Sequence, residues 1–130
     1  MKRPRPTSSP CPCGGSTYAA CCAPYHSGTP APDAEALMRS RYSAYALKLE
    51  PYLLATWHRD TRPDVLDLSQ DAAQWLGLEV KRHAMSSPES AIVEFIARYK
   101  LNGRAHRLHE ISRFVRENGQ WLYIDGNFPE

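Results

Sequence analysis

All four cysteines of this 130-residue chain lie in one short segment near its start, at Cys11, Cys13, Cys21 and Cys22. Four thiolates match the tetrahedral geometry and the soft ligands that zinc prefers. The segment has little apolar bulk of its own, so metal binding would supply much of its folding free energy. The spacing predicts one zinc ion per chain, with His26 as a substitute for one member of the adjacent cysteine pair.

Disulfides, a redox pair and incidental thiols are the alternatives to zinc for the clustered cysteines, and all three stay open. The chain opens with a basic, polar stretch, Met1–Pro10, which lacks the apolar core of a signal peptide. We therefore expect a reducing, cytoplasmic compartment, where clustered cysteines are more often metal ligands than disulfides. The sequence also lacks the Cys-x-x-Cys spacing of common redox motifs. Gly14 and Gly15 let the backbone turn beneath a bound ion.

The composition is that of one ordinary domain with a small appendage. A net charge of +2, from 16 basic and 14 acidic side chains, requires neither a nucleic-acid nor a membrane partner. No apolar run approaches the roughly 18 residues that a membrane span needs. We divide the chain into a flexible basic tail (1–10), a zinc knuckle (11–26), a linker (27–32) and an α+β domain (33–130).

Helices are expected in the first half of the α+β domain. Between positions 34 and 49, apolar residues recur at three- and four-residue steps, which predicts an amphipathic helix with Asp33 as its N-cap. Shorter helices are expected over 52–57 and over 67–76, the latter ending at Gly77. The hydrophobic period then changes to two, which is typical of strands. The strands are expected at residues 78–85, 91–101, 104–116 and 120–126.

Two Asn-Gly pairs, Asn102-Gly103 and Asn118-Gly119, separate the last three expected strands. Asn-Gly between alternating apolar runs is a strong signal for a two-residue hairpin turn. The predicted fold class is therefore α+β, with N-terminal helices packed on a curved antiparallel sheet of about four strands.

The two turns also fix which residues face one another across the strands. Phe95 should oppose Glu110 around the first turn, and Ser112 should oppose Asp125 around the second. One sheet face then collects aromatic side chains around carboxylates, which need partners when they are buried. Arg41, in the apolar stripe of the first helix, is the predicted ion-pair partner of Glu110 or Asp125. The expected pocket residues are Arg41, Tyr42, Tyr45, Trp57, His58, Phe95, Glu110, Ser112, Tyr123 and Asp125.

The cysteine pattern, with Tyr18 between its two pairs, resembles the SEC-C motif, a small zinc module also found at the C-terminus of the translocase motor SecA. The loop between Cys13 and Cys21 is one residue shorter than is usual for that motif. Residues 37–45, 56–58 and 109–114 resemble the bacterial YchJ family, so the resemblance covers nearly the whole chain. It implies a nuclear-transport-factor-two-like cone, in which a curved sheet wraps a long helix and leaves a pocket.

Two functional hypotheses follow. In the first, the chain is an adaptor whose knuckle recognises a protein or ribosomal partner, because the SEC-C resemblance implies a role in translation or protein handling. In the second, the pocket binds a small molecule or performs catalysis, with a wall carboxylate as general base and His58 as its partner. A structural ion pair is the simpler interpretation of the same residues. The sequence contains no nucleophile elbow, phosphate loop or dinucleotide motif, so we do not predict an enzyme.

Nucleic-acid binding ranks third among the hypotheses. A basic stripe is available on the expected hairpins, but acidic residues interrupt it and such stripes are usually solvated. Its members are Arg98, Lys100, Arg104, Arg107 and Arg113.

Overall fold

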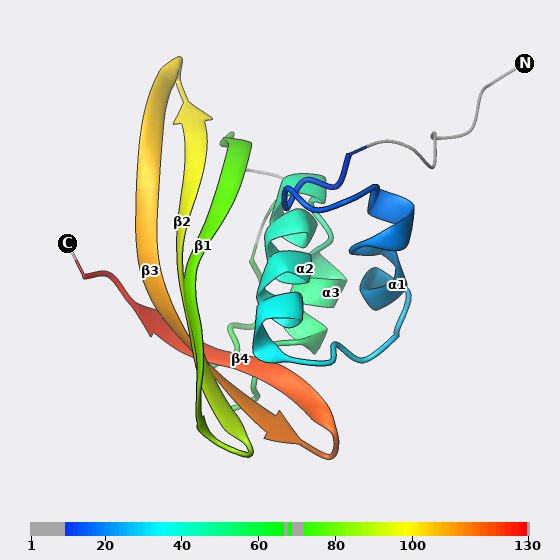
Figure 1. Cartoon of the computed structure of the whole chain (residues 1–130). Coiled ribbons are helices and arrows are strands. Elements are labelled where there is room, and N and C mark those ends of the chain that lie inside the picture. Colours follow the sequence, from blue (N-terminus) through cyan, green and yellow to red (C-terminus); the bar gives the residue numbers. More distant parts are fainter. Residues whose placement is uncertain (1–9, 67, 69–71, 130) are drawn as a thin grey trace, which may run out of the picture.

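The computed structural model describes residues 10–66, 68 and 72–129, in which helices cover one face of a single antiparallel sheet (Figure 1). This confirms the predicted α+β class. The helical elements are η1 (Tyr18–Ala20), α1 (Ala23–His26), α2 (Ala34–Leu47) and α3 (Glu50–Ala55). The strands are β1 (Gln74–Ser87), β2 (Ser90–Leu101), β3 (Arg104–Glu117) and β4 (Gln120–Asn127), in the order β1-β2-β3-β4.

The predicted tail falls almost entirely outside the described residues. Its last residue, Pro10, forms an isolated antiparallel bridge with Thr17. Among the helices that the structure describes, none combines the length and the apolar character that crossing a membrane requires.

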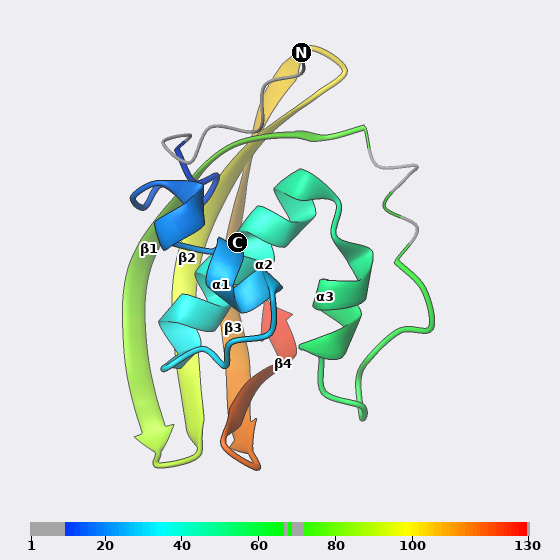
Figure 2. The same ribbon diagram turned by 90° about the vertical axis from the view of Figure 1, so that its right-hand side faces the viewer.

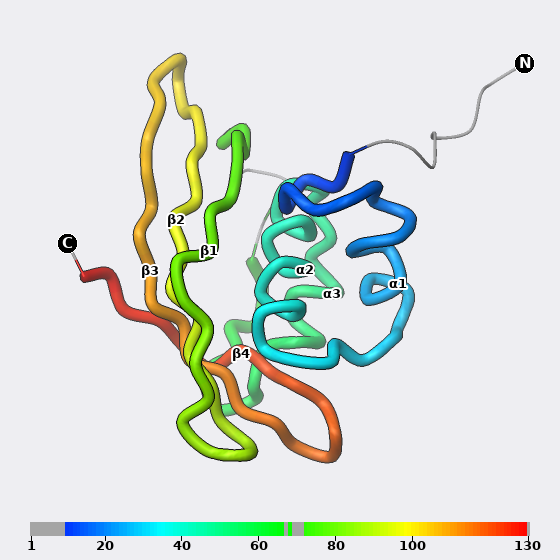
Figure 3. Tube along the Cα trace, viewed as in Figure 1, coloured from blue at the N-terminus to red at the C-terminus, as the bar shows by residue number. Residues whose placement is uncertain are grey.

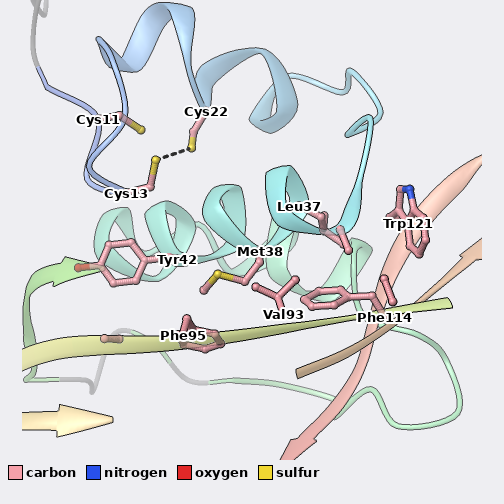
Figure 4. Packing of buried hydrophobic residues seen from close by; sticks show 13 residues of the cluster. Cys11, Cys13, Cys22, Leu37, Met38, Tyr42, Val93, Phe95, Phe114 and Trp121 are labelled. Atoms are coloured by element: carbon pink, nitrogen blue, oxygen red, sulfur yellow. Dashed lines mark hydrogen bonds between the residues drawn. The ribbon is translucent and has the colours of Figure 1, made fainter. Parts of the chain in front are cut away.

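Helix α2 forms the centre of the molecule, between the sheet on one side and the N-terminal segment on the other (Figures 1 and 2). It begins as predicted, because the Asp33 carboxylate accepts a hydrogen bond of 2.8 Å from the backbone N–H of Ala36. It ends at Lys48, which takes the left-handed conformation with φ of 60°. Its sheet side packs into the hydrophobic core shown in Figure 4, which includes Leu37, Met38, Tyr42, Val93, Phe95, Phe114 and Trp121.

The predicted helix over 67–76 is wrong from residue 72 onward, whereas Leu68 within the predicted range has 3-10 helical conformation. Residues 67 and 69–71 lie outside the described residues, but 72 and 73 are not helical and β1 already begins at Gln74. Gln74 pairs with Lys100 of β2, and the Trp75 ring packs 5.3 Å from that of Tyr99. Sheet pairing and aromatic packing therefore override the local helical pattern. The β1 trace bends along its length (Figure 3), and it has three register shifts against β2.

Both predicted Asn-Gly turns are confirmed. Asn102 and Gly103 have φ of 54° and 78°, and Asn118 and Gly119 have φ of 53° and 78°. Positive φ at both central residues is the signature of the type I′ turn, whose twist matches that of the flanking strands. The register around the first turn also follows the prediction, since Phe95 lies opposite Glu110.

The predicted register around the second turn holds only as far as Phe114, which lies opposite Tyr123. A bulge then intervenes, so that Arg113 pairs with Asp125 and Ser112 pairs with the following Gly126. A one-residue shift moves a side chain to the other sheet face. The predicted place of Asp125 among the pocket residues is therefore wrong. Its carboxylate instead accepts hydrogen bonds of 2.6 and 2.8 Å from the exposed Arg113 guanidinium.

Gly126 occupies the position opposite Ser112 that the sequence assigned to Asp125, and it has no room for a side chain. A Cβ there would lie 2.7 Å from Cδ and 2.9 Å from Cγ of Glu110. We expect Gly126→Ala to displace the Glu110 carboxyl group and lower the free energy of unfolding by about 1–3 kcal/mol, as overpacking does. Denaturant unfolding measures this.

Gly77→Ala is the matched control, because Gly77 also lies in a strand and a Cβ there would meet no atom within 4 Å. We expect it to leave the unfolding midpoint almost unchanged. Equal midpoints for Gly126→Ala and Gly77→Ala would show that the position of the Glu110 side chain does not require a residue without Cβ at position 126.

Candidate metal centre and pocket

The four predicted cysteine ligands come together. Figure 4 shows three of them, Cys11, Cys13 and Cys22, beside α2 on the side away from the sheet. The backbone N–H of Cys11 donates to the carbonyl of Ser16 at 3.0 Å, which closes the first pair into a tight loop. Cys21 follows η1 and Cys22 directly precedes α1, so a change of helix separates the adjacent thiols. All four sulfur atoms, including that of Cys13, lie within 4.8 Å of one another.

The sulfur spacing fits a tetrahedral metal ion. The Sγ atom of Cys13 lies 3.6 Å from that of Cys21 and 3.7 Å from that of Cys22, and the last two are 3.9 Å apart. Zinc–sulfur bonds of about 2.3 Å place thiolates ~3.8 Å apart at the corners of a tetrahedron. The adjacent pair therefore reaches a common centre, and the four cysteines could hold a metal.

Burial and charge within the cluster favour a cation. Three of the thiols are buried and Cys21 is half-buried. A hydrogen bond from the Cys22 thiol lowers the pKa of Cys13 to about 4, and burial raises the pKa of Cys21 to about 11. Without a metal, negative charge concentrates on Cys13 while Cys21 and Cys22, whose pKa values are raised, keep their protons. A divalent cation that replaces those protons would bind all four sulfurs and balance two of their four negative charges.

The two glycines beside Cys13 serve different purposes. Gly14 has φ of +90°, which L side chains rarely adopt, so it provides the turn that the sequence predicts. Gly15 instead provides space, because a Cβ there would lie only 2.7 Å from the Sγ atom of Cys21. The close approach of the backbone to the sulfurs therefore requires Gly15.

Side chains of α2 hold the cysteine cluster in place. The fully buried Ser43 Oγ lies 3.4 Å from the Sγ atom of Cys11 and donates to that of Cys22 at 3.3 Å. Arg39 Nη1 donates to the carbonyl of Cys13 at 3.3 Å. Sequence reasoning missed Ser43, and its only signal was a hydroxyl within the otherwise apolar part of the helix.

His26 is not placed as a metal ligand, contrary to its predicted substitute role. Its Nε2 lies 2.8 Å from the carbonyl oxygen of Ser40, so this nitrogen carries the proton and donates. Its Nδ1 then accepts from the hydroxyl of Tyr18 at 2.7 Å. Both ring nitrogens are occupied, and His26 anchors the knuckle to α2.

Arg41 is buried on the sheet side of α2, with only 5% of its surface exposed. Its Nη1 donates to the carbonyl of Leu53 at 2.8 Å and to Oγ1 of Thr56 at 2.7 Å. Its Cζ atom lies 5.0 Å from the ring centroid of Trp57 and 4.6 Å from that of Tyr123. Two aromatic faces and two oxygen acceptors therefore stabilise the cation.

The predicted ion pair of Arg41 with Glu110 or Asp125 is wrong. In the part of the chain that the structure describes, no carboxylate oxygen lies within 4.0 Å of the Arg41 guanidinium. Asp125 lies on the other sheet face, and Glu110 is engaged elsewhere. The guanidinium is thus a buried cation without a contacting counter-ion.

Glu110 is the buried carboxylate of the sheet. Its Oε2 accepts hydrogen bonds from Ser112 Oγ at 2.7 Å and from the Tyr123 hydroxyl at 3.2 Å. Burial, together with this carboxylate, raises the pKa of Tyr123, so its phenol is neutral at physiological pH. Tyr123 therefore contacts Arg41 with its ring and Glu110 with its hydroxyl.

A pocket of about 260 Å³ lies between α2 and the concave face of the sheet. Seven of the predicted residues line it, namely Arg41, Tyr42, Tyr45, Phe95, Glu110, Ser112 and Tyr123. The sequence did not assign five other wall residues, Met38, Trp75, Ala97, Leu108 and Phe114. Trp75 was missed because its segment was expected to be helical.

Three predicted pocket residues do not line it. Trp57 packs behind Tyr123, and Asp125 lies on the opposite sheet face. His58 is buried, with Nε2 2.8 Å from a carboxylate oxygen of Glu117 and Nδ1 accepting from the backbone N–H of Asp60 at 3.1 Å. His58 thus fastens the loop after α3 to the end of β3.

Residues 33–126 match the protein family described as YchJ, middle NTF2-like domain. A UPF0225 protein of Methylibium petroleiphilum is 58% identical over 119 residues, which cover 90% of this chain and 87% of that protein. A UPF0225 protein of Chromobacterium violaceum is 55% identical over 132 residues, covering 97% and 98% of the two chains.

Two solved structures share the fold. One is a SEC-C motif containing protein from Rhodopseudomonas palustris, with a TM-score of 0.83 and 34% identity over 93% of this chain and 99% of that chain. The other, from Psychrobacter arcticus, is also a SEC-C motif containing protein, with a TM-score of 0.79 and 30% identity over 95% and 85% of the two chains.

Proposed function

The chain belongs to the YchJ family, also described as UPF0225, and we propose that it is a zinc-binding adaptor whose knuckle recognises a protein or ribosomal partner. The observation that carries this proposal is the docking of the knuckle. The cysteine cluster is joined to α2 through Ser43 and Arg39, and His26 adds a third attachment. A bound ion would therefore fix the knuckle as a rigid surface on the body of the protein.

Zinc is the proposed ion, and its role is structural. Cys11, Cys13, Cys21 and Cys22 supply four thiolates at tetrahedral spacing, and a closed set of four thiolates is typical of structural zinc. When bound, the ion would cross-link the two cysteine pairs and leave no coordination position for a substrate. The knuckle would then act through its surface, on which Ala19 and Ala20 of η1 are exposed.

We expect about one zinc ion per chain in protein purified without added metal or chelator, as for a single four-thiolate site. Cys11→Ser, Cys13→Ser and Cys22→Ser should each lose the ion, because a serine hydroxyl replaces a thiolate. Elemental analysis of the purified variants measures this. His26→Ala should keep the ion, since its nitrogens bind Tyr18 and Ser40. Metal-free wild-type protein with four reactive thiols, or with disulfides, would contradict the zinc proposal.

Partner recognition by the knuckle is tested by Ala20→Glu, which places a charge on its exposed surface. We expect this variant to keep its zinc and its melting temperature but to lose proteins or ribosomes that cross-link to the wild type in cell extract. Ala72→Glu introduces the same change at an exposed position outside the knuckle, and it should keep those partners. Equal recovery of the same partners by both variants would exclude the knuckle as the recognition surface.

A second candidate function, binding of a small molecule, is favoured by the pocket beside Arg41. Its volume of about 260 Å³ exceeds the ~150 Å³ of an apolar cavity that holds benzene. Only Nη1 of Arg41 has described hydrogen bonds, so the other guanidinium N–H groups are available to a ligand. A fitting molecule has one aromatic ring for the apolar walls and an oxygen-rich group for Arg41.

Phenylacetate is a suitable probe of this pocket, with its uncharged analogue phenylacetamide for comparison. We expect phenylacetate to shift amide NMR signals of the pocket walls and to bind about tenfold more tightly than the amide, the equivalent of ~1.4 kcal/mol. Ala97→Leu should block both, because Ala97 is buried in the pocket wall. Ala105→Leu, at an exposed strand position, is the control. Unchanged binding in Ala97→Leu would place the probe elsewhere.

A further inference from the structure

We infer that the protruding end of the β2–β3 hairpin, residues 98–107, binds the phosphate backbone of single-stranded nucleic acid. We call this segment the basic arm. It extends past α2 and the knuckle at one end of the molecule (Figures 1 and 2). The inference is independent of zinc and of the pocket, since the basic arm contributes no cysteine and no pocket residue.

The charge of the whole chain originates in the basic arm. No acidic residue occurs between Glu94 and Glu110, whereas this interval holds four Lys or Arg residues. The rest of the chain carries 12 basic and 14 acidic side chains, so its balance is negative. The net charge of +2 therefore conceals an uneven charge distribution, with four uncompensated positive charges in this interval of the sequence. The four basic residues, all exposed, are Arg98, Lys100, Arg104 and Arg107.

The register between β2 and β3 places positively charged side chains opposite one another. Arg98 lies directly opposite Arg107, an arrangement in which like charges repel. Arg98 has a carboxylate neighbour, Glu79 at 3.6 Å, but Lys81 shares that carboxylate at 3.3 Å. Among the described residues, Arg107 has no carboxylate within 4.0 Å. The basic arm thus concentrates positive charge that the protein itself does not neutralise.

Arg113 does not belong to this group, although the sequence placed it in the same stripe. The bulge in the β3–β4 pairing sets Arg113 against Asp125, which engages its guanidinium with two hydrogen bonds. The acids that interrupt the stripe in the sequence therefore lie outside the basic arm. What remains is a short, uninterrupted cluster.

The basic arm also has a surface for stacking along a free strand edge. The rings of Tyr99 and His106 stack with centroids 5.1 Å apart and an interplanar angle of 19°, and His106 is exposed. Because β4 pairs with β3 only from Ile111 onward, no described strand pairs with the outer edge of β3 at the basic arm. A nucleic-acid strand lying along this edge would meet Arg107 on one face of the sheet and His106 on the other. Phosphate contacts combined with base stacking are characteristic of single-strand binding.

The test is fluorescence anisotropy with a labelled oligouridylate of about 12 nucleotides, a length within the range of single-strand binding sites. Binding should weaken with added salt, and each lost phosphate contact should reduce the logarithmic slope by about 0.7. Arg104→Gln/Arg107→Gln should therefore reduce the slope by ~1.4 relative to the wild type. His106→Ala should weaken binding at least about fivefold through lost stacking.

Arg113→Gln is the matched control, because it removes one charge from the same strand but leaves the basic arm intact. It should bind as the wild type does. Oligodeoxyuridylate of the same length separates the two sources of the ligand, since tighter binding of RNA would indicate contact with the 2′-hydroxyl and equal binding would indicate phosphate and stacking alone. Either result supports the inference.

Four outcomes would overturn it. The first is absence of binding to either oligonucleotide at about 50 mM salt, where phosphate contacts are strong. The second is equal weakening in Arg113→Gln and Arg104→Gln/Arg107→Gln. The third is self-association of Arg104→Gln/Arg107→Gln without any effect on RNA, which would show that the charges only prevent pairing of the open edge. Binding to phosphatidylglycerol vesicles without binding to RNA would likewise replace nucleic acid by a membrane surface.

Discussion

The rest of the structure depends on the burial of α2 on almost all sides. A helix in that position must satisfy every polar group that it carries, because a buried polar group without a partner is costly. Three of its fully or nearly buried residues are polar, namely Ser40, Arg41 and Ser43. Their partners come from α3, from the N-terminal segment and from the sheet. The polar residues of α2 therefore determine how the surrounding elements are attached.

Ser40 contacts both α3 and the N-terminal segment, and Ser43 contacts the cysteine cluster. The Ser40 hydroxyl bonds to the Tyr52 hydroxyl at 2.6 Å, and its carbonyl receives the His26 ring at 2.8 Å. Ser43 contacts two of the sulfur atoms. Arg41 attaches α3 through Leu53 and also contacts the ring of Tyr123 from β4. A single helix thus connects the cysteine cluster, α3 and the sheet.

The parts of the fold that were predictable from the sequence depend on local chemistry. Asp33 capped a helix and the Asn-Gly pairs formed turns, because each needs only its neighbours in the chain. The bulge beside Arg113 was not predictable from the turn alone, since it sets Gly126 against the buried Glu110 side chain, a contact that no local pattern in the sequence specifies. The strand at Gln74 was missed for the same reason, because its partner lies far along the chain.

The same distinction applies to the candidate sites. The metal site could be predicted from the sequence, because its four cysteines lie close together with metal-ligand spacing. The partners of Arg41 could not be predicted in this way. A buried guanidinium suggested a carboxylate partner, yet carbonyl, hydroxyl and aromatic groups stabilise it instead. Such partners carry no distinctive sequence signal.

The cysteine cluster and the pocket lie on opposite sides of one helix, so they share its position. Ser43 contacts the sulfurs while the neighbouring Tyr42 lines the pocket. An ion that fixes the cluster would remove freedom from the helix on its outer side, and the pocket walls on the inner side would be more ordered as a result. The order of the pocket walls would then depend on the metal ion, even though a molecule bound in the pocket could not contact that ion. The basic arm differs in this respect, because it extends beyond α2 and its strands are held by hairpin pairing.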